Sequence, residues 1–397
     1  MFDHVDAYPG DPILSLNEDF QKDSRPNKIN LSIGIYFDDA GKLPVMASVR
    51  EAEKQIAIEA GARPYLPMSG IPEYCDAVKD LVFGHAVQNS RVAVLQTIGA
   101  SGALKVGSDF LKRYFPDSMV WISDPSWENH RVVFEGSGFV VNTYPYYDPV
   151  TGGLQFDKMV ETLKTLPPRS IVLLHACCHN PTGVDLTREQ WQALIPVFLK
   201  RQLVAFVDMA YQGFGDDVEG DAFAGRALAA GGVTTLVANS FSKNFSLYGE
   251  RCGGLSVVCS SVDERNRVFG QLMATVRANY SNPPTHGAKV IAGVLNDEKL
   301  YAEWHTELQA MRNRIREMRR AIRDGLAERT QGLDLSRYLN QRGMFTFTGL
   351  NTVQVDRLRD EYGVYLLRSG RMCVAGLNER NVSPVASAIA NVLAQSN

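Results

Sequence analysis

The chain has 397 residues, with 41 Lys and Arg against 44 Asp and Glu, and so a formal net charge of −3. Its 45% hydrophobic and 21% charged fractions are those of a globular protein with a large core, and its length suggests two domains. The near-neutral balance excludes a polybasic nucleic-acid binder and an acidic disordered tail, and it points to a small, local partner.

The start of the chain carries no targeting signal, because Asp3 and Asp6 stand where a signal peptide needs basic residues. No stretch approaches the roughly 18 apolar residues of a membrane helix. Six cysteines are too few for a disulfide framework. These features predict a soluble, cytoplasmic protein that does not bind membranes.

Between residues 90 and 260, short β-branched runs alternate with amphipathic stretches. This alternation predicts an α/β fold, with a seven-stranded and mainly parallel sheet flanked by helices. The predicted strands are Arg91–Thr97, Met119–Ser123, Phe139–Tyr144, Ser170–His175, Leu203–Asp208, Thr235–Ser240 and Gly254–Cys259. The predicted helices are Ala103–Tyr114, Phe156–Thr165, Arg188–Arg201, Ala222–Ala230 and Val262–Val276.

A long helix is predicted for Asp297–Arg329, because apolar residues recur there at three- and four-residue steps. We expect this helix to join two bodies. The C-terminal part reads as a small α+β domain, with strands at Met344–Thr348 and Val364–Leu367 and helices at Val353–Tyr362 and Val382–Leu393. The predicted organisation is an N-terminal arm (1–11), a small domain (12–43 and 311–397) and a large domain (44–310).

Ligands of open α/β sheets bind outside the carboxyl ends of the strands, so the residues that follow each strand are informative. After the first strand, Gly99–Gly102 opens a helix, where backbone N–H groups could hold a phosphate. The alternative is a tight turn with Ser101 as the helix N-cap. After the second strand, Trp127 could pack in the core or stack on a flat ligand.

The segment His175–Gly183, which begins with the last residue of the strand, contains two histidines and two cysteines, with Cys177 and Cys178 adjacent. This spacing does not fit a tetrahedral zinc site, so no metal is predicted. Asn180, in the turn that follows, has an amide that can donate or accept a hydrogen bond to a ligand.

The next two strand ends carry charged side chains. Asp208 ends an apolar strand, and a buried carboxylate needs a cation, either in a structural ion pair or on a ligand. Lys243 lies near Arg251, and a lysine beside other cations becomes a nucleophile when its pKa is depressed. The alternative for Lys243 is an ordinary loop lysine.

Together these strand ends offer a phosphate cradle, a flat ring, an amide, a buried acid with the phenol of Tyr211, and a lysine with an arginine. Pyridoxal phosphate needs each of these groups: an amine for its aldehyde, an anion for its ring nitrogen, donors for its phenolate oxygen, and a cradle for its phosphate.

These motifs also carry a family resemblance. The segments Tyr65–Pro67, Ser126–His130, Cys178–Gly183, Asp208–Phe214, Ser240–Phe245, Arg277–Pro284 and Ser369–Arg371 resemble those of the fold-type I, subgroup I aminotransferases, the aspartate and aromatic-amino-acid enzymes. The similarity runs over essentially the whole chain. It implies pyridoxal 5'-phosphate as cofactor and a homodimer with shared active sites.

The resemblance implies a catalytic lysine and two binding sites. Lys243 attaches to the cofactor and moves the substrate proton, while Asp208 pairs with the ring nitrogen and Tyr211 contacts the phenolate oxygen. The cofactor-binding residues it implies are Lys243, Ala100, Ser101, Trp127, His130, Asn180, Asp208, Tyr211, Ser240, Arg251 and, from the neighbouring subunit, Tyr65. The substrate-binding residues it implies are Gly34, Trp127, Asn180, Arg371 and, from the neighbouring subunit, Arg277.

The expected reaction is a ping-pong transamination between an L-amino acid and 2-oxoglutarate. Phe37 and Leu43, with Ser101 in the phosphate loop, make the expected pocket mouth apolar and favour tyrosine and phenylalanine, with side activity on aspartate. Local packing is the alternative role for Phe37 and Leu43. Asn282 is typical of aspartate aminotransferases, which remain the alternative function.

Three other functions are less well supported. A lyase or synthase with the same cofactor would not need Arg277, and an effector domain of a regulator would carry a DNA-binding module. A nicotinamide dehydrogenase would need a Gly-x-Gly-x-x-Gly motif after a strand, with an acid about 20 residues later, and this sequence has no such pattern.

Overall fold

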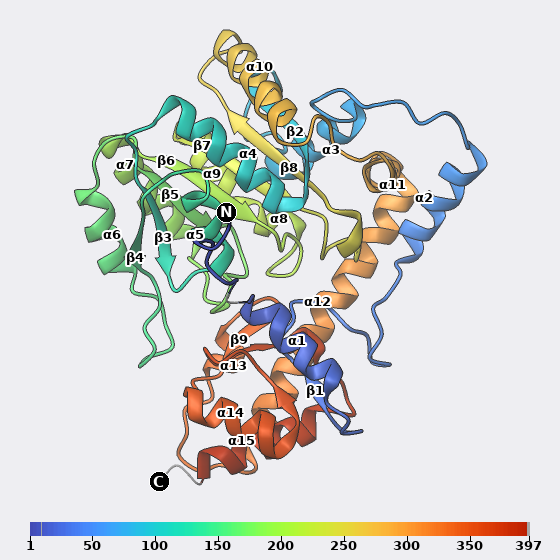
Figure 1. Cartoon of the computed structure of the whole chain (residues 1–397), viewed down its shortest axis with the longest axis vertical. Helices are drawn as coiled ribbons and strands as arrows, with labels where there is room; N and C mark the ends of the chain where they lie inside the picture. The colour runs from blue at the N-terminus through green and yellow to red at the C-terminus, as the bar shows by residue number, and fades with distance from the viewer. Residues whose placement is uncertain (9, 395–397) are drawn as a thin grey trace. The chain divides into compact units, whose positions relative to one another are not determined.

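The structure, a computed structural model, describes residues 1–8 and 10–394. The chain divides into two compact units, one formed by Met1–Leu43 with Ile315–Asn397 and the other by Pro44–Arg314. Figure 1 shows the elements of both units in chain order. Among the described residues, no helix is both long enough and apolar enough to cross a membrane.

The unit Pro44–Arg314 is built around a seven-stranded sheet with the order β2-β8-β7-β6-β5-β3-β4. Six strands are parallel, and β8 runs antiparallel to both of its neighbours. The prediction of an α/β fold with a mainly parallel sheet is confirmed, and all seven predicted strands are present. Their bounds are β2 Val92–Ile98, β3 Val120–Asp124, β4 Val141–Pro145, β5 Ile171–His175, β6 Val204–Met209, β7 Thr234–Ser240 and β8 Cys252–Val258.

Helices cover both faces of this sheet because its strands are apolar on both sides (Figure 1). Leu236 and Ala238 of β7 belong to the main core cluster, as do buried residues of α4 (Gly99–Tyr114) and α10 (Val262–Asn279). The residue between them, Val237, faces the opposite side and lies against Gly225. Gly225 belongs to α9 (Phe223–Ala230), which packs on α7 (Arg188–Arg201), and α7 in turn packs on α6 (Phe156–Thr165).

The structure adds helices that the hydrophobic pattern does not predict. In the large unit these are α2 Ala47–Ile58, α3 Pro72–Phe83, α5 Glu128–Glu135, α8 Val218–Asp221 and α11 His286–Leu295. The long predicted helix is α12 (Glu298–Ala327). Asp297 begins it, because its carboxylate accepts the N–H groups of Lys299 and Leu300 at 2.9 Å each.

The unit Met1–Leu43 with Ile315–Asn397 holds two small sheets. In the parallel pair, β1 (Ile29–Asn30) lies beside β10 (Val364–Tyr365), and in the antiparallel pair β11 (Arg371–Cys373) lies beside β9 (Phe345–Phe347). The helices of this unit, besides the end of α12, are α1 Pro12–Lys22, α13 Arg337–Asn340, α14 Thr352–Tyr362 and α15 Val382–Ala394.

Candidate active site

The polar groups of the large unit gather at one edge of the sheet. The five strands that precede the motifs, β2, β3, β5, β6 and β7, all point the same way, so their carboxyl ends share that edge. The register aligns the carboxyl ends of neighbouring strands, since His175 of β5 pairs with Asp208 of β6, and Met209 of β6 pairs with Asn239 of β7. The topology therefore gathers residues that are more than 100 positions apart in the sequence.

Asp208, at the end of β6, is buried, and one of its two carboxylate oxygens is satisfied. His130 Nε2 donates to Asp208 Oδ2 at 2.9 Å, and the other ring nitrogen of His130 lies 2.9 Å from Ser126 Oγ. Asp208 Oδ1 has no hydrogen-bond partner among the described residues. A buried carboxylate oxygen without a donor is costly, so this atom fits a ligand that brings an N–H group.

The charges around Asp208 keep it ionised. Burial alone would raise the pKa of this carboxyl, but the hydrogen bond and charge of His130, with smaller contributions from His175 and Lys243, hold its pKa below the ordinary value. His175 is buried, and desolvation together with His130 lowers its pKa to about 3. The site therefore contains the ionised carboxylate of Asp208 close to the neutral ring of His175.

The histidines and cysteines of His175–Gly183, whose spacing does not fit a zinc site, have other surroundings. Nitrogens of His179 lie 2.9 Å from Ser123 Oγ and 2.8 Å from Thr182 Oγ1, and neither Cys177 nor Cys178, both among the described residues, is in a disulfide. The ligand atoms of a different group, His130, His175 and Asp208, lie within 4.8 Å of one another. In that group, His130 Nε2 already donates to the carboxylate.

Lys243 and Tyr211 lie together at the same edge. Lys243 Nζ is 5.0 Å from the centroid of the Tyr211 ring, and Tyr211 is buried whereas Lys243 is half-buried. Lys243 also contributes to the electrostatics of Asp208. These positions set an amine beside a phenol and near a carboxylate, rather than on a solvated loop.

A cradle of backbone atoms lies at the start of α4. An added Cβ at Gly253 would approach Gly99 C at 2.5 Å and Ala100 N at 2.9 Å. The backbone of β8 can therefore come this close to the start of α4 only because residue 253 is a glycine. The Arg251 guanidinium borders the same turn, 2.9 Å from the Cβ position of Gly99, and donates to Ser242 Oγ at 3.2 Å. Helix N–H groups with an adjacent guanidinium suit a phosphate.

The alternative role of Ser101 as a helix N-cap is wrong. The helix α4 begins two residues earlier at Gly99, its N-cap is Ile98, and no side chain caps it. Ser101 therefore lies in the first turn, near the N–H groups that would face an anion. Ser240, at the end of β7, pairs with Gly253 in the sheet and accepts the N–H of Ser242 at 3.2 Å.

Substituting Gly253 by Ala should disrupt this cradle. The new methyl group would meet backbone atoms that cannot rotate away, and overpacking of this kind costs about 1–3 kcal/mol. We expect a lower Tm and a cofactor Kd raised at least tenfold, measured by thermal unfolding and by cofactor titration of the apoprotein. Gly249→Ala is the matched control, because no atom lies within 4 Å of its Cβ position. Equal behaviour of the two variants would contradict the cradle.

Trp127 and Asn180 complete the edge. Trp127 is half-buried and packs against the core cluster, and its ring meets that of His130 edge-on with centroids 5.2 Å apart. Core packing therefore describes part of its environment, while the residue keeps some exposure. Asn180 is buried in the turn after β5.

Arg371 belongs to the other compact unit, where it is buried. It donates to the carbonyl oxygen of Ser32 at 2.7 Å, and its guanidinium carbon lies 4.3 Å from the centroid of Phe345. Gly34 lies against the same ring, because a Cβ there would be 2.8 Å from the end of Phe345. Phe37 lines a pocket of about 1040 Å³ in this unit, and Leu43 is exposed.

Tyr65 and Arg277 stand apart from these groups within the single chain. The side chain of Tyr65 is 92% exposed, and the exposed Arg277 donates to Ser281 Oγ. Neither residue joins the contacts described around Asp208 and Lys243.

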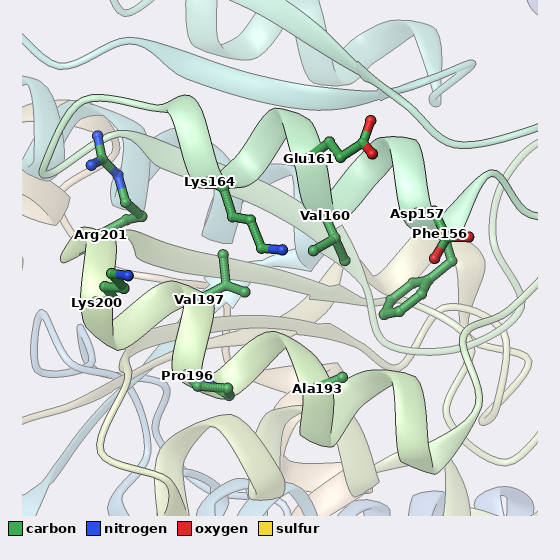
Figure 2. Close-up of a pocket in the computed structure, with 10 residues that line it drawn as sticks. All are labelled: Phe156, Asp157, Val160, Glu161, Lys164, Ala193, Pro196, Val197, Lys200 and Arg201. Carbon is green, nitrogen blue, oxygen red and sulfur yellow. The ribbon is translucent and has the colours of Figure 1, made fainter.

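The structure also has a groove of about 850 Å³ between α6 and α7 (Figure 2). Lys164, Lys200 and Arg201 line one end of it, in the last turns of the two helices. Basic side chains at helix C-termini stabilise the helix dipoles, which accounts for their position. None of the candidate site residues lines this groove.

The fold and the edge geometry define a class of protein. A seven-stranded sheet with a glycine and arginine cradle, a charged buried acid with one unsatisfied oxygen, and a lysine beside a phenol has the parts of a pyridoxal-phosphate-dependent enzyme. Residues 26–389 match the family described as "Aminotransferase class I and II". The chain belongs to this family, and it is a pyridoxal-phosphate-dependent aminotransferase.

Similar proteins cover the whole chain. It is 56% identical to the "Aromatic-amino-acid aminotransferase" of Escherichia coli K12, over 99% of this chain and 100% of that protein. It is 44% identical to the "Aspartate aminotransferase" of the same strain, over 99% of this chain and 100% of that protein. A solved aromatic amino acid aminotransferase from Burkholderia cenocepacia J2315 is 63% identical with a TM-score of 0.96, over 100% of both chains.

Proposed function

We propose that this aminotransferase exchanges the amino group between an aromatic L-amino acid and 2-oxoglutarate, in two half-reactions, and retains activity on aspartate. The observation that carries the aromatic preference is the difference in identity to two enzymes of one bacterium, 56% to the aromatic and 44% to the aspartate enzyme. The alternative is an aspartate aminotransferase, which a relative from Pseudomonas aeruginosa with that name, 50% identical, favours.

The residues at the sheet edge hold the cofactor and move the proton. When bound, pyridoxal phosphate supplies an aldehyde that takes the amino group and a ring that accepts the electron pair of the substrate α-carbon. Asp208 Oδ1, which has no other donor among the described residues, would accept the ring N–H of the cofactor, while His130 holds the other carboxylate oxygen. Lys243 would move a proton from the substrate α-carbon to the former aldehyde carbon of the cofactor in the first half-reaction, and in the opposite direction in the second.

The remaining residues orient the two molecules. Tyr211 and Asn180 would donate hydrogen bonds to the phenolate oxygen of the cofactor, and Trp127 would stack on its ring. Ala100, Ser101, Ser240 and Arg251 hold the phosphate, as the cradle at the start of α4 suggests.

The substrate binds through its carboxylates and its side chain. Arg371 binds the α-carboxylate through two parallel hydrogen bonds, and Gly34 leaves room beside it. Phe37 and Leu43 contact an aromatic side chain, and burial of a phenyl group contributes roughly 1.5–3 kcal/mol, enough to decide between substrates.

A second copy of this chain completes the site. Tyr65 and Arg277 are exposed in the single chain and reach the site of the neighbouring subunit. The N-terminal segment also exposes large apolar side chains, with Met1 99%, Phe2 76% and Tyr8 78% accessible. Burial of such side chains against a partner is favourable, which supports a homodimer.

All six cysteines lie among the described residues and none is in a disulfide, which supports a reducing, cytoplasmic location. The proposed partners are small amino acids and 2-oxo acids, with no nucleic acid. A lyase reaction would release product without a 2-oxo acid, so dependence of turnover on 2-oxoglutarate separates it from transamination.

Arg277→Leu should reduce activity on dicarboxylates selectively. Hydrogen bonds to a charged group contribute about 1.5–3 kcal/mol, so we expect kcat/KM for aspartate to fall about 10- to 100-fold. The value for phenylalanine, measured in the half-reaction without 2-oxoglutarate, should change less than about threefold. Equal losses for both amino acids would contradict the role of Arg277 as a clamp for the distal carboxylate.

Mixed subunits test whether Arg277 acts across the dimer. When Arg277→Leu is refolded together with an inactive Lys243→Ala variant, one site of each mixed dimer regains both native residues. Activity on aspartate should then exceed that of either variant alone, whereas no recovery would place Arg277 in its own subunit's site.

The proposed substrate preference is tested by comparing kcat/KM for tyrosine, phenylalanine and aspartate with 2-oxoglutarate as acceptor. Higher values for both aromatic substrates than for aspartate are expected. A value for aspartate that exceeds both would establish the alternative function.

A further inference from the structure

The two loops that carry Tyr211 and Lys243 are tied together by the side chain of Asn244. Asn244 follows Lys243 directly, and Gln212 follows Tyr211. The Asn244 amide nitrogen donates to the carbonyl oxygen of Gln212 at 3.2 Å, and both residues are buried. This bond joins the positions next to the amine and the phenol, so it sets the spacing of the two loops directly.

Asn244 is itself held by the helix α12. Trp304 Nε1 donates to the carbonyl oxygen of Asn244 at 2.8 Å, and the fully buried Trp304 ring stacks on Phe245 with centroids 4.9 Å apart. A stacked ring has little freedom to move. The loop after β7 is therefore fixed at its backbone by the indole as well as through the Asn244 side chain.

The loop of Tyr211 is anchored separately to the same helix. Arg312 donates to the carbonyl oxygen of Gly213 at 3.0 Å, and Gly213 lies so close to Leu308 that a Cβ would be 2.4 Å from its methyl carbon. Asp221 accepts the N–H of Gly213 at 2.8 Å. Both loops thus have their own supports, and the Asn244 amide joins one to the other.

We propose that Asn244 is a positioning residue, which holds the Lys243 amine at its distance from the Tyr211 phenol by tying the loop after β7 to the loop after β6. Trp304 acts through Asn244 by fixing its backbone. This inference rests on the roles proposed for Lys243 and Tyr211. A displacement near 1 Å at a reacting group can cost about 100-fold in rate, so a single buried amide is sufficient to matter.

The test compares Asn244→Ala with a control that loses a similar bond elsewhere. Tyr144→Phe is that control, because the buried Tyr144 hydroxyl donates to the carbonyl oxygen of Leu173 at 2.8 Å. Both changes leave a buried carbonyl without its side-chain donor. Trp304→Phe is the second test variant, because it keeps a ring beside Phe245 but removes the indole donor.

The first measurement is the pH titration of the visible absorbance of the bound cofactor in each holoenzyme. We expect its midpoint to move by at least about 0.5 pH unit in Asn244→Ala, and in the same direction by less in Trp304→Phe. Tyr144→Phe should titrate as the native protein does. The second measurement is steady-state kinetics, where kcat should fall about 10- to 100-fold in Asn244→Ala while KM changes less than about threefold.

An unchanged midpoint and kcat in a folded, cofactor-loaded Asn244→Ala would overturn the proposal, as would equal shifts in the Tyr144→Phe control. If Asn244→Ala does not fold, Trp304→Phe decides by the same two readouts. If the native enzyme prefers aspartate to the aromatic amino acids, only the proposed function is contradicted. The absorbance titration still tests Asn244, because it does not depend on which amino acid is used.

Discussion

Lys243→Ala should abolish transamination and leave the folded protein unable to hold its cofactor covalently. The amine of Lys243 lies beside Tyr211 and near Asp208, and the variant loses both a nucleophile and a proton carrier. General acid–base contributions reach about 10⁴-fold, so we expect kcat to fall by at least that factor. The measurements are turnover and the visible absorbance of the protein after incubation with pyridoxal phosphate.

Lys200→Ala is the matched control, since Lys200 is exposed on α7 and lines the groove in Figure 2, which contains none of the candidate site residues. It should keep native turnover and absorbance. Native activity in Lys243→Ala would refute its catalytic role.

Asp208→Asn should have the second largest effect. The amide keeps the size of the carboxylate but cannot keep a ring nitrogen protonated, and removal of one preorganised electrostatic group costs about 10²–10³ in kcat. The native carboxyl is ionised throughout the working pH range, because its surroundings hold its pKa below 3.8. Steady-state kinetics of the folded variant measure this loss, and an unchanged kcat would contradict the role of Asp208.

The same shift has a consequence for stability. A carboxyl whose pKa is lowered in the folded state stabilises the protein at pH values above its pKa in the unfolded chain, about 3.8. This contribution is lost as the pH falls from there toward the lower pKa of the folded state. Urea unfolding between pH 5 and pH 3 should therefore show a steeper loss for the native protein than for Asp208→Asn. Parallel losses would mean that Asp208 has no lowered pKa.

The sequence predicts the central sheet well because the strands carry their own signal. Continuous β-branched runs mark β5 and β6, and the predicted strand ends lie within two residues of the observed ones. The helix α7 begins where predicted, because Thr187 and Gln190 form a capping box. In contrast, α1 is not predicted and has no buried residue, although Asp11 and Pro12 are a start signal that could have located it.

The candidate site is only partly visible in the sequence. Asp208 and Lys243 are recognisable because each follows a strand, and the resemblance supplies roles for both. The bond from Asn244 to Gln212 depends on how two loops meet, and no local pattern indicates it. The sequence indicates no role for His175 in the site, and only the folded chain places its ring beside that of His130.

The proposed arrangement at the sheet edge depends most on one covalent bond, the one expected between the cofactor and Lys243. Borohydride reduction of the holoenzyme fixes the cofactor on the lysine that carries it, and peptide mass analysis then identifies that residue. The expected result is a single modified peptide that contains Lys243. Modification of a different lysine, with Lys243 unmodified, would contradict the account.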